Sequence, residues 1–262
     1  MTKIYNASTR RQLFRAAAAV AASAPFLMSK SASAGQFGNP GKFCSPQDHC
    51  CFLKGTAILT CSGERPVEEL KIGDQIQTLT GMKPIKWIGR RKFAKEESRA
   101  WQREVMPVRI ARSALADNVP SRDLYLSHKH CIFYDGALIP VGYLVNDTSI
   151  IQDIPADVDV IEYYHIEFET HEVLYAEGAA VESFLDDGSG RETYANFAEY
   201  ERLYGESQSK MTPFAPILAY YGGRDEVKGL VRAAVSKVVD IRDPIQRAYD
   251  RLAERAQPTL AE

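Results

Sequence analysis

A cysteine, a serine and a histidine provide the side chains that nucleophilic chemistry requires. Cys51 opens an apolar run, and about 75 residues later Ser127 and His130 stand three positions apart, directly after the apolar segment 124–126. A cysteine is only a few per cent thiolate at neutral pH, so it needs a neighbouring base or a polarised electrophile to act as a nucleophile. These residues therefore predict attack by a thiol that an imidazole and a hydroxyl assist.

Short apolar segments alternate with turn residues from residue 51 to about residue 183, which is typical of an all-β domain. The dipeptides Thr80-Gly81 and Asp135-Gly136 favour hairpin turns, the second between segments 131–134 and 137–139. This pattern places Cys51 at the start of the β domain and His130 near the end of a strand. Strands are expected at 56–60, 75–79, 85–88, 106–110, 124–126 and 158–168.

The pattern becomes helical beyond residue 183. A helix is expected at 192–203, and apolar residues recur at helical spacing over 227–238. Asp243 and Pro244 then predict the cap and the first residue of a further helix. The polar face of the 227–238 stripe mixes both signs of charge, so we expect it to pack on the β domain or on a protein partner rather than on a membrane.

Several motifs in order resemble the Hint domain, which hedgehog autoprocessing domains and inteins share, and in particular its bacterial, stand-alone Hint-2-like branch. The resemblance implies a mainly β Hint fold over residues 51–186, with residues 187–262 as a helical C-terminal extension. The segment 171–178 is similar to the last strand of that fold. The matching segments are 51–60 (CFLKGTAILT), 65–74 (RPVEELKIGD), 127–130 (SHKH), 138–140 (LIP), 144–146 (LVN) and 171–178 (HEVLYAEG).

The resemblance also implies a reaction on the chain's own peptide bond between Cys50 and Cys51. In that family the thiol, here Cys51, attacks the carbonyl of the preceding residue, which converts the amide into a thioester. His130 would polarise or strain this amide and protonate the departing nitrogen, Ser127 would hydrogen-bond the same backbone, and His171 would assist. An intramolecular acyl shift with a positioned acid is physically sound. It implies no cofactor and no metal.

The residues at the end of the match depart from inteins. Splicing requires a terminal His-Asn pair followed by Cys, Ser or Thr, whereas this chain has Glu182-Ser183 there. We therefore expect no splicing, and expect water or another nucleophile of unknown identity to resolve the thioester. Two alternatives stay open: a catalytically silent, exported binding module with the Hint fold, and a cysteine hydrolase that uses Cys51 and His130 on an external substrate in trans.

Residues 1–34 predict a signal for twin-arginine export. They contain five basic and no acidic residues, a twin-arginine pattern over 8–14, a small apolar run and the A-x-A sequence at 32–34. Export to the periplasm or secretion is expected, without a stable membrane anchor because the run is too short to span a bilayer. Residues 35–50 predict an extended arm. Cleavage before Cys51 would detach the signal from the β domain, so the sequence leaves two alternatives: cleavage that follows export, or no cleavage at all.

Composition and cysteine count bound the remaining functions. The net charge of −2 without a dense basic block argues against a general nucleic-acid binder. Five cysteines leave at least one thiol unpaired, which we expect to be Cys51. His128 and His130 are expected on one strand face, two positions apart, and with Cys44, Cys50 or Cys131 they are a weaker candidate for zinc, because neither a C-x-x-C pair nor an H-x₃-H spacing is present. Cys61 and Cys131 are expected on strands, and two disulfides would leave Cys51 free. The candidate structural cysteines, whose pairing the sequence leaves open, are Cys44, Cys50, Cys61 and Cys131.

Overall fold

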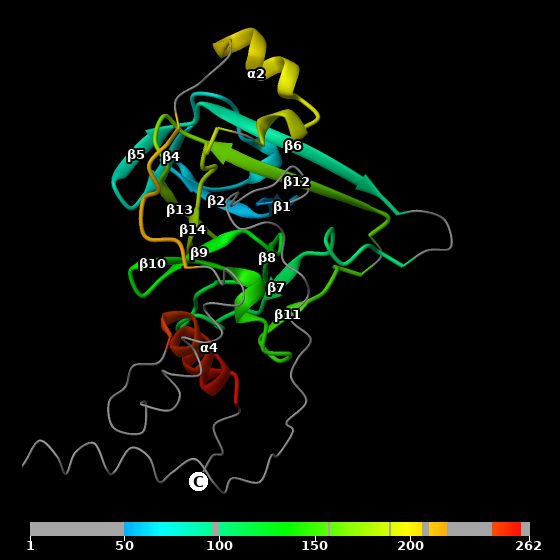
Figure 1. Cartoon of the computed structure of the whole chain (residues 1–262), viewed down its shortest axis with the longest axis vertical. Helices are drawn as coiled ribbons and strands as arrows, with labels where there is room; N and C mark the ends of the chain where they lie inside the picture. The colour runs from blue at the N-terminus through cyan, green and yellow to red at the C-terminus, as the bar shows by residue number, and fades with distance from the viewer. Residues whose placement is uncertain are drawn as a thin grey trace, which may run out of the picture. The chain divides into compact units, whose positions relative to one another are not determined.

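The computed structural model describes residues 50–95, 100–156, 158–188, 190–205, 210–218 and 243–257 (Figure 1). The predicted export signal, the arm up to residue 49 with Cys44, and the helical stripe 227–238 lie outside these residues. Two antiparallel sheets and two α-helices make up the described part of residues 39–262. The expectation of a mainly β fold with helices after the β domain is confirmed.

The first sheet holds the strand that follows Cys51. Its order is β11-β7-β8-β1-β12-β6, so the short β1 lies between β8 and β12. Phe52 pairs with Leu126 on one side and with Tyr164 on the other. This register brings the end of β8, and the turn after it, beside Cys51. The strands are β1 (Phe52–Leu53), β6 (Trp87–Ala94), β7 (Val108–Ile110), β8 (Leu124–Leu126), β11 (Ile150–Gln152) and β12 (Val160–Glu167).

The second sheet runs in the order β10-β9-β14-β13-β2-β4-β5, and β3 pairs with β2. The Asp135-Gly136 turn joins β9 to β10 with both residues at positive φ, as a tight hairpin turn requires. Apolar side chains from both sheets form the main core, which includes Ile58, Leu126 and Leu174. Its strands are β2 (Ala57–Thr60), β3 (Gly63–Pro66), β4 (Gln75–Thr78), β5 (Gly81–Pro84), β9 (Cys131–Tyr134), β10 (Ala137–Pro140), β13 (Val173–Ala176) and β14 (Ala179–Glu182).

Three local expectations need correction. The segment 171–178 is not the last strand, because Glu177 and Gly178 turn the chain at positive φ into β14. His128 and His130 lie in the turn after β8 rather than on a strand face. Cys61 lies one residue beyond β2, and it forms no disulfide with Cys131 or another described cysteine.

The helix expected at 192–203 is shorter than predicted. A 3₁₀ turn (η3, Arg191–Thr193) comes first, and α2 (Phe197–Tyr204) follows it. Asp243 caps α4 (Pro244–Arg255) by accepting a hydrogen bond from the Ile245 amide, as expected. The apolar side chains of α4 join the main core. None of the described helices has the length and hydropathy needed to cross a membrane. Two further 3₁₀ turns are η1 (Val67–Glu69) and η2 (Val141–Leu144).

Candidate functional site

The turn after β8 holds the backbone on both sides of the Cys50–Cys51 peptide bond. The Cys51 amide donates to Ser127 Oγ at 2.7 Å, and the Ser127 amide donates to the Cys51 carbonyl at 2.9 Å. The Cys50 thiol lies 3.6 Å from the carbonyl oxygen of Lys129 in the same turn. The turn from Ser127 to His130 thus lies against the Cys50–Cys51 peptide bond. The nitrogen that an acyl shift must release already carries a hydrogen bond to Ser127.

The Cys51 side chain is completely buried. Its Sγ lies 3.8 Å from the hydroxyl of Tyr194 and packs in an aromatic cluster that includes Trp87 and Tyr163. Burial raises the pKa of the Tyr163 hydroxyl well above its usual value, and this hydroxyl donates to the Val105 carbonyl at 2.8 Å. The Cys51 thiol is therefore shielded from solvent by groups of its own chain.

His130 is fully buried, and its environment fixes its tautomer. Nε2 lies 3.1 Å from the carbonyl oxygen of Glu182, which only accepts, so Nε2 carries a proton. Burial lowers the pKa of His130 to about 3, although the nearby backbone of Glu182 and Cys51 favours the charged form. Nδ1 is therefore an unprotonated acceptor near neutral pH, and it is buried without a hydrogen-bond partner. His130 can take up a proton at Nδ1 before it donates one.

His171 contacts the end of the fold rather than Cys51. Its Nδ1 accepts from the Phe214 amide at 3.0 Å, so the proton is on Nε2, which lies 3.1 Å from the Ser183 carbonyl. Burial lowers the pKa of His171 to about 4. Its Nε2 also lies 3.7 Å from the carboxylate of Glu182, whose pKa burial raises to about 7. His171 thus holds the Glu182-Ser183 segment, and no described contact joins its side chain to Cys51.

Two residues that the motifs did not single out adjoin Cys51. The Tyr194 hydroxyl, which touches Cys51 Sγ, also lies 3.1 Å from Nδ1 of His165. The His165 ring is 5.2 Å from the His130 ring between centroids, and burial lowers the pKa of His165 well below its usual value. We call His130, His165 and His171 the histidine cluster. Its three rings are buried and held neutral near pH 7.

His165 carried a signal that sequence reasoning passed over. Tyr163, His165 and Glu167 alternate along β12, so they share one face of the sheet, and all three are buried. Polar residues on a buried strand face need partners. Tyr194 carried no such signal, because 143 residues separate it from Cys51.

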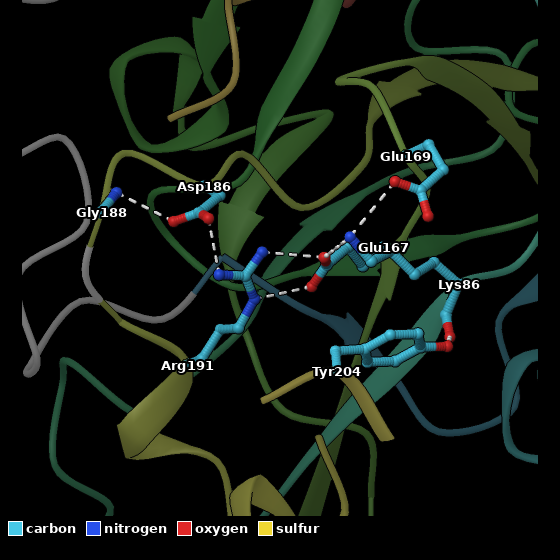
Figure 2. Close-up of polar contacts among 7 residues, drawn as sticks. All are labelled: Lys86, Glu167, Glu169, Asp186, Gly188, Arg191 and Tyr204. Atoms are coloured by element: carbon cyan, nitrogen blue, oxygen red, sulfur yellow. Dashed lines mark hydrogen bonds and ion pairs between the residues drawn. The ribbon is translucent and has the colours of Figure 1, made fainter. Parts of the chain in front are cut away.

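A buried ion cluster attaches the segment after residue 188 to the β domain (Figure 2). Arg191 donates through Nε and Nη2 to both carboxylate oxygens of Glu167, at 2.9 and 2.8 Å, and through Nη1 to Asp186 at 2.6 Å. The Tyr204 hydroxyl donates to the Lys86 carbonyl at 2.6 Å. We call Arg191, Glu167 and Asp186 the Arg191 clamp. It fixes the chain just before Tyr194, and the Tyr204 contact fixes it beyond.

No metal site is evident in the described residues, because they contain no group of three His, Cys, Asp or Glu side chains placed to share an ion. His128, the other histidine of the turn, packs against Gly142, where an added Cβ would lie 2.1 Å from its ring.

A comparison with family models and a search of solved structures both returned matches. A family model described as a Hint domain matches residues 50–188. A structure of the gp41-1 intein is 16% identical, with a TM-score of 0.35, and covers 50% of this chain and 97% of that one. A DnaB intein from Synechocystis sp. PCC 6803 is 8% identical, with a TM-score of 0.35, and covers 52% of this chain and 100% of that one.

A third similar structure is a bacterial intein-like domain from Clostridium thermocellum. It is 11% identical, with a TM-score of 0.31, and the match covers 52% of this chain and 100% of that one. A search of curated proteins returned no match. The family model stops at residue 188, so it leaves out Arg191 and Tyr194.

Proposed function

The chain belongs to the Hint domain family, and on that premise we propose that it cleaves its own peptide bond between Cys50 and Cys51 through a thioester, without splicing. Membership of this family implies a capacity for self-processing in general. The observation that carries the specific reaction is the 2.7 Å hydrogen bond from the Cys51 amide to Ser127 Oγ, beside a buried thiol.

The acyl shift proceeds with balanced atoms. Cys51 Sγ bonds to the carbonyl carbon of Cys50, the bond from that carbon to the Cys51 nitrogen breaks, and the thiol proton ends on this nitrogen. Ser127 Oγ holds the nitrogen and has its own O–H to offer once the nitrogen becomes basic. Since Nδ1 of His130 is unprotonated near neutral pH, His130 first accepts a proton and then acts as the acid. Water or another nucleophile then resolves the thioester.

The contacts of Glu182 and Ser183 support cleavage without splicing. A glutamate has no amide nitrogen to cyclise, and the Glu182 carboxylate is occupied by the Cys131 amide at 2.7 Å. Ser183 Oγ accepts from the Glu172 amide at 2.9 Å. The chain then continues into the Arg191 clamp, which favours retention of the residues after 183.

Hydrolysis of an external substrate in trans is disfavoured by the burial of Cys51, because a substrate would have to displace the aromatic cluster around its thiol. The remaining alternative is a binding module that has the Hint fold and does not cleave itself, and the test below distinguishes it from the proposal.

The test is the intact mass of the purified chain and of Cys51→Ala, each incubated with and without dithiothreitol. The proposal predicts that the unmodified chain yields a product that begins at Cys51, faster with thiol, and that Cys51→Ala stays whole. A chain that persists at full length and behaves like Cys51→Ala would establish the silent binding module instead.

A further inference from the structure

A tyrosine from outside the family match contacts the reacting sulfur. Tyr194 lies six residues beyond the end of the match, between η3 and α2, and its hydroxyl is 3.8 Å from Cys51 Sγ and 3.1 Å from Nδ1 of His165. One hydroxyl therefore bridges the thiol and a buried imidazole. Such a bridge is the arrangement that general base assistance through a relay requires.

The polar neighbours of His165 give this bridge a direction. The Nδ1 of His165 faces the Tyr194 hydroxyl at 3.1 Å, and its Nε2 is buried without a hydrogen-bond partner. With the proton on Nε2, Nδ1 is an acceptor and takes the Tyr194 hydroxyl proton. The oxygen of Tyr194 is then left to accept from the Cys51 thiol.

We propose that Tyr194 and His165 form a proton relay that deprotonates Cys51, so that the segment after the family match completes the reactive site. This inference rests on the proposed cleavage at Cys50–Cys51 and adds the route by which the thiol loses its proton. Tyr194 is a catalytic residue because it touches the reacting sulfur, and His165 is a positioning residue that acts through Tyr194.

The proton balance of the relay closes through His130. The Cys51 S–H proton passes to the Tyr194 oxygen while the Tyr194 proton passes to Nδ1 of His165. His165 Nε2 and His130 Nδ1 are both buried without a hydrogen-bond partner, and their rings are neighbours. No hydrogen bond joins these two nitrogens, so one ring must shift before the Nε2 proton of His165 passes to Nδ1 of His130; His130 then gives a proton to the Cys51 nitrogen as the carbon–nitrogen bond breaks. The relay thus moves one proton from the Cys51 sulfur to the Cys51 nitrogen, restores the Tyr194 hydroxyl, and leaves His165 with its proton on Nδ1 instead of Nε2.

The charged and titratable groups around the relay come from every adjoining element. Burial is the main reason that the pKa of His165 is low, and His130 and His171 lower it further. Arg91 on β6 lies 4.4 Å from the Tyr194 ring centroid, and its charge acts in the same direction. Tyr163 on β12 stays protonated, because burial raises its pKa well above the usual value. His165 is therefore a weak base that holds the proton only while the reaction proceeds.

Packing holds Tyr194 in one place. Its ring lies edge-on to Trp87, with centroids 5.5 Å apart, and so close to Gly89 that an added Cβ would lie 2.6 Å from it. Together with the Arg191 clamp, these contacts hold the ring where its hydroxyl lies 3.8 Å from Cys51 Sγ. A tyrosine held so closely loses little entropy when it acts.

The experiment compares cleavage rates of the full chain, Tyr194→Phe and His165→Asn across pH, read by intact mass. Near pH 7 we expect both variants to be slowed at least about 10-fold, because general base assistance contributes ~10²–10⁴-fold. The gap should narrow as pH rises, because a growing share of the thiol then ionises without the relay. The asparagine introduced by His165→Asn retains an acceptor for Tyr194 but takes up no proton, so the slower rate of this variant reports the relay and not packing.

Tyr200→Phe is the matched control. Tyr200 lies in the same segment, packs on Trp87 and has a buried hydroxyl without a partner, so its loss should leave the cleavage rate unchanged. A Tyr194→Phe rate equal to that of the unmodified chain at pH 7, or reduced by one constant factor at every pH, would overturn the relay.

A second measurement separates failure of the relay from failure of cleavage. If the unmodified chain stays intact, the proposed cleavage fails, and the far-ultraviolet thiolate absorbance of Cys51, taken as the difference from Cys51→Ser, still tests the relay. The relay predicts ionisation at a higher pH in Tyr194→Phe, by about one pH unit or more. Identical titrations in the two chains would overturn it.

Discussion

The Arg191 clamp and the histidine cluster are both buried, and they handle charge in opposite ways. In the clamp, Arg191 meets two carboxylates, and each of its three donating nitrogens has a carboxylate oxygen within 2.9 Å. In the histidine cluster burial keeps the rings neutral, and one nitrogen each of His130 and His165 has no partner. A fully paired cluster resists change, whereas unpartnered nitrogens with lowered pKa values can exchange protons.

The Arg191 clamp and the histidine cluster share strand β12, and Tyr194 lies next to both. Tyr163, His165 and Glu167 share a buried face of β12, so Glu167 in the clamp and His165 in the cluster are two positions apart. Tyr194 follows Arg191 by three positions and reaches back to Cys51. The clamp thus provides the rigidity that the histidine cluster requires for chemistry at Cys51.

Breaking the clamp should give the largest effect on stability. Arg191→Met leaves the carboxylates of Glu167 and Asp186 buried without their main partner, so we expect a loss of ~3–5 kcal/mol in the free energy of unfolding. Urea denaturation measures it. Arg251→Met is the matched control, since Arg251 and Asp135 form an exposed pair worth ~0–1 kcal/mol. Equal losses of unfolding free energy in the two variants would show that the buried Arg191 clamp stabilises the fold no more than an exposed ion pair.

The histidine cluster should make stability fall with acid. The unfolded chain protonates its histidines near pH 6.5, whereas burial lowers the pKa of His130 to about 3 and of His171 to about 4, with that of His165 also lowered. The pKa of Glu182 is raised to about 7, so the folded chain holds one extra proton there between pH 4.5 and 7. The unfolded state therefore binds about two more protons, and stability is lost as pH falls.

The expected slope is ~2–3 kcal/mol per pH unit between about pH 6 and 5. Urea denaturation at successive pH values measures it. His130→Gln keeps a donor for the Glu182 carbonyl and cannot be protonated, so it should reduce the slope by about one proton. A slope that is unchanged by this substitution would show that His130 is not held neutral in the folded chain.

A variant that displaces the Tyr194 ring should show whether its position matters for the cleavage rate as well as for stability. Gly89→Ala puts a Cβ 2.6 Å from the Tyr194 ring, so we expect a loss of ~1–3 kcal/mol and slower cleavage. Gly136→Ala is the control, because alanine strains the positive φ of the β9–β10 turn, and its Cβ would meet no atom within 4 Å. Thermal unfolding and intact mass report both properties. Cleavage slowed equally in both variants would argue against a specific role for the Tyr194 position.

The smallest expected difference in cleavage rate is between alanine variants of two buried serines. Ser127 accepts from the Cys51 amide and Ser183 accepts from the Glu172 amide, at 2.7 and 2.9 Å. Each change to alanine leaves one buried amide unsatisfied, so each should cost ~1–3 kcal/mol. We expect only Ser127→Ala to slow cleavage. Equal cleavage rates for Ser127→Ala and Ser183→Ala would remove Ser127 from the mechanism.

Much of the fold could be predicted because its signals are local. The alternation over 75–78 and 124–126, the Asp135-Gly136 turn and the Asp243 cap each depend on neighbouring residues, and all are found in the structure. The ends of strands differ from the prediction where contacts with distant strands decide them. The predicted strand at 85–88 begins instead at Trp87 and extends to Ala94, because it pairs along the length of β12.

The residues of the candidate site also fall into those that the sequence could predict and those that it could not. Cys51, Ser127 and His130 could be placed together because ordered motifs resemble a known family. His171 is near the end of the β domain, but its contacts are with Ser183 and Phe214. Tyr194 could not be predicted, since its contact with Cys51 depends on how the segment after residue 188 docks through the Arg191 clamp.

The central claim is that Cys51 forms a thioester with the carbonyl of Cys50. The most direct measurement is the mass of the N-terminal fragment released when the full chain is incubated with hydroxylamine. The account predicts a fragment that ends at Cys50 as the hydroxamate, a remainder that begins at Cys51, and neither product from Cys51→Ala. An uncut chain, or the same fragment from Cys51→Ala, would contradict it.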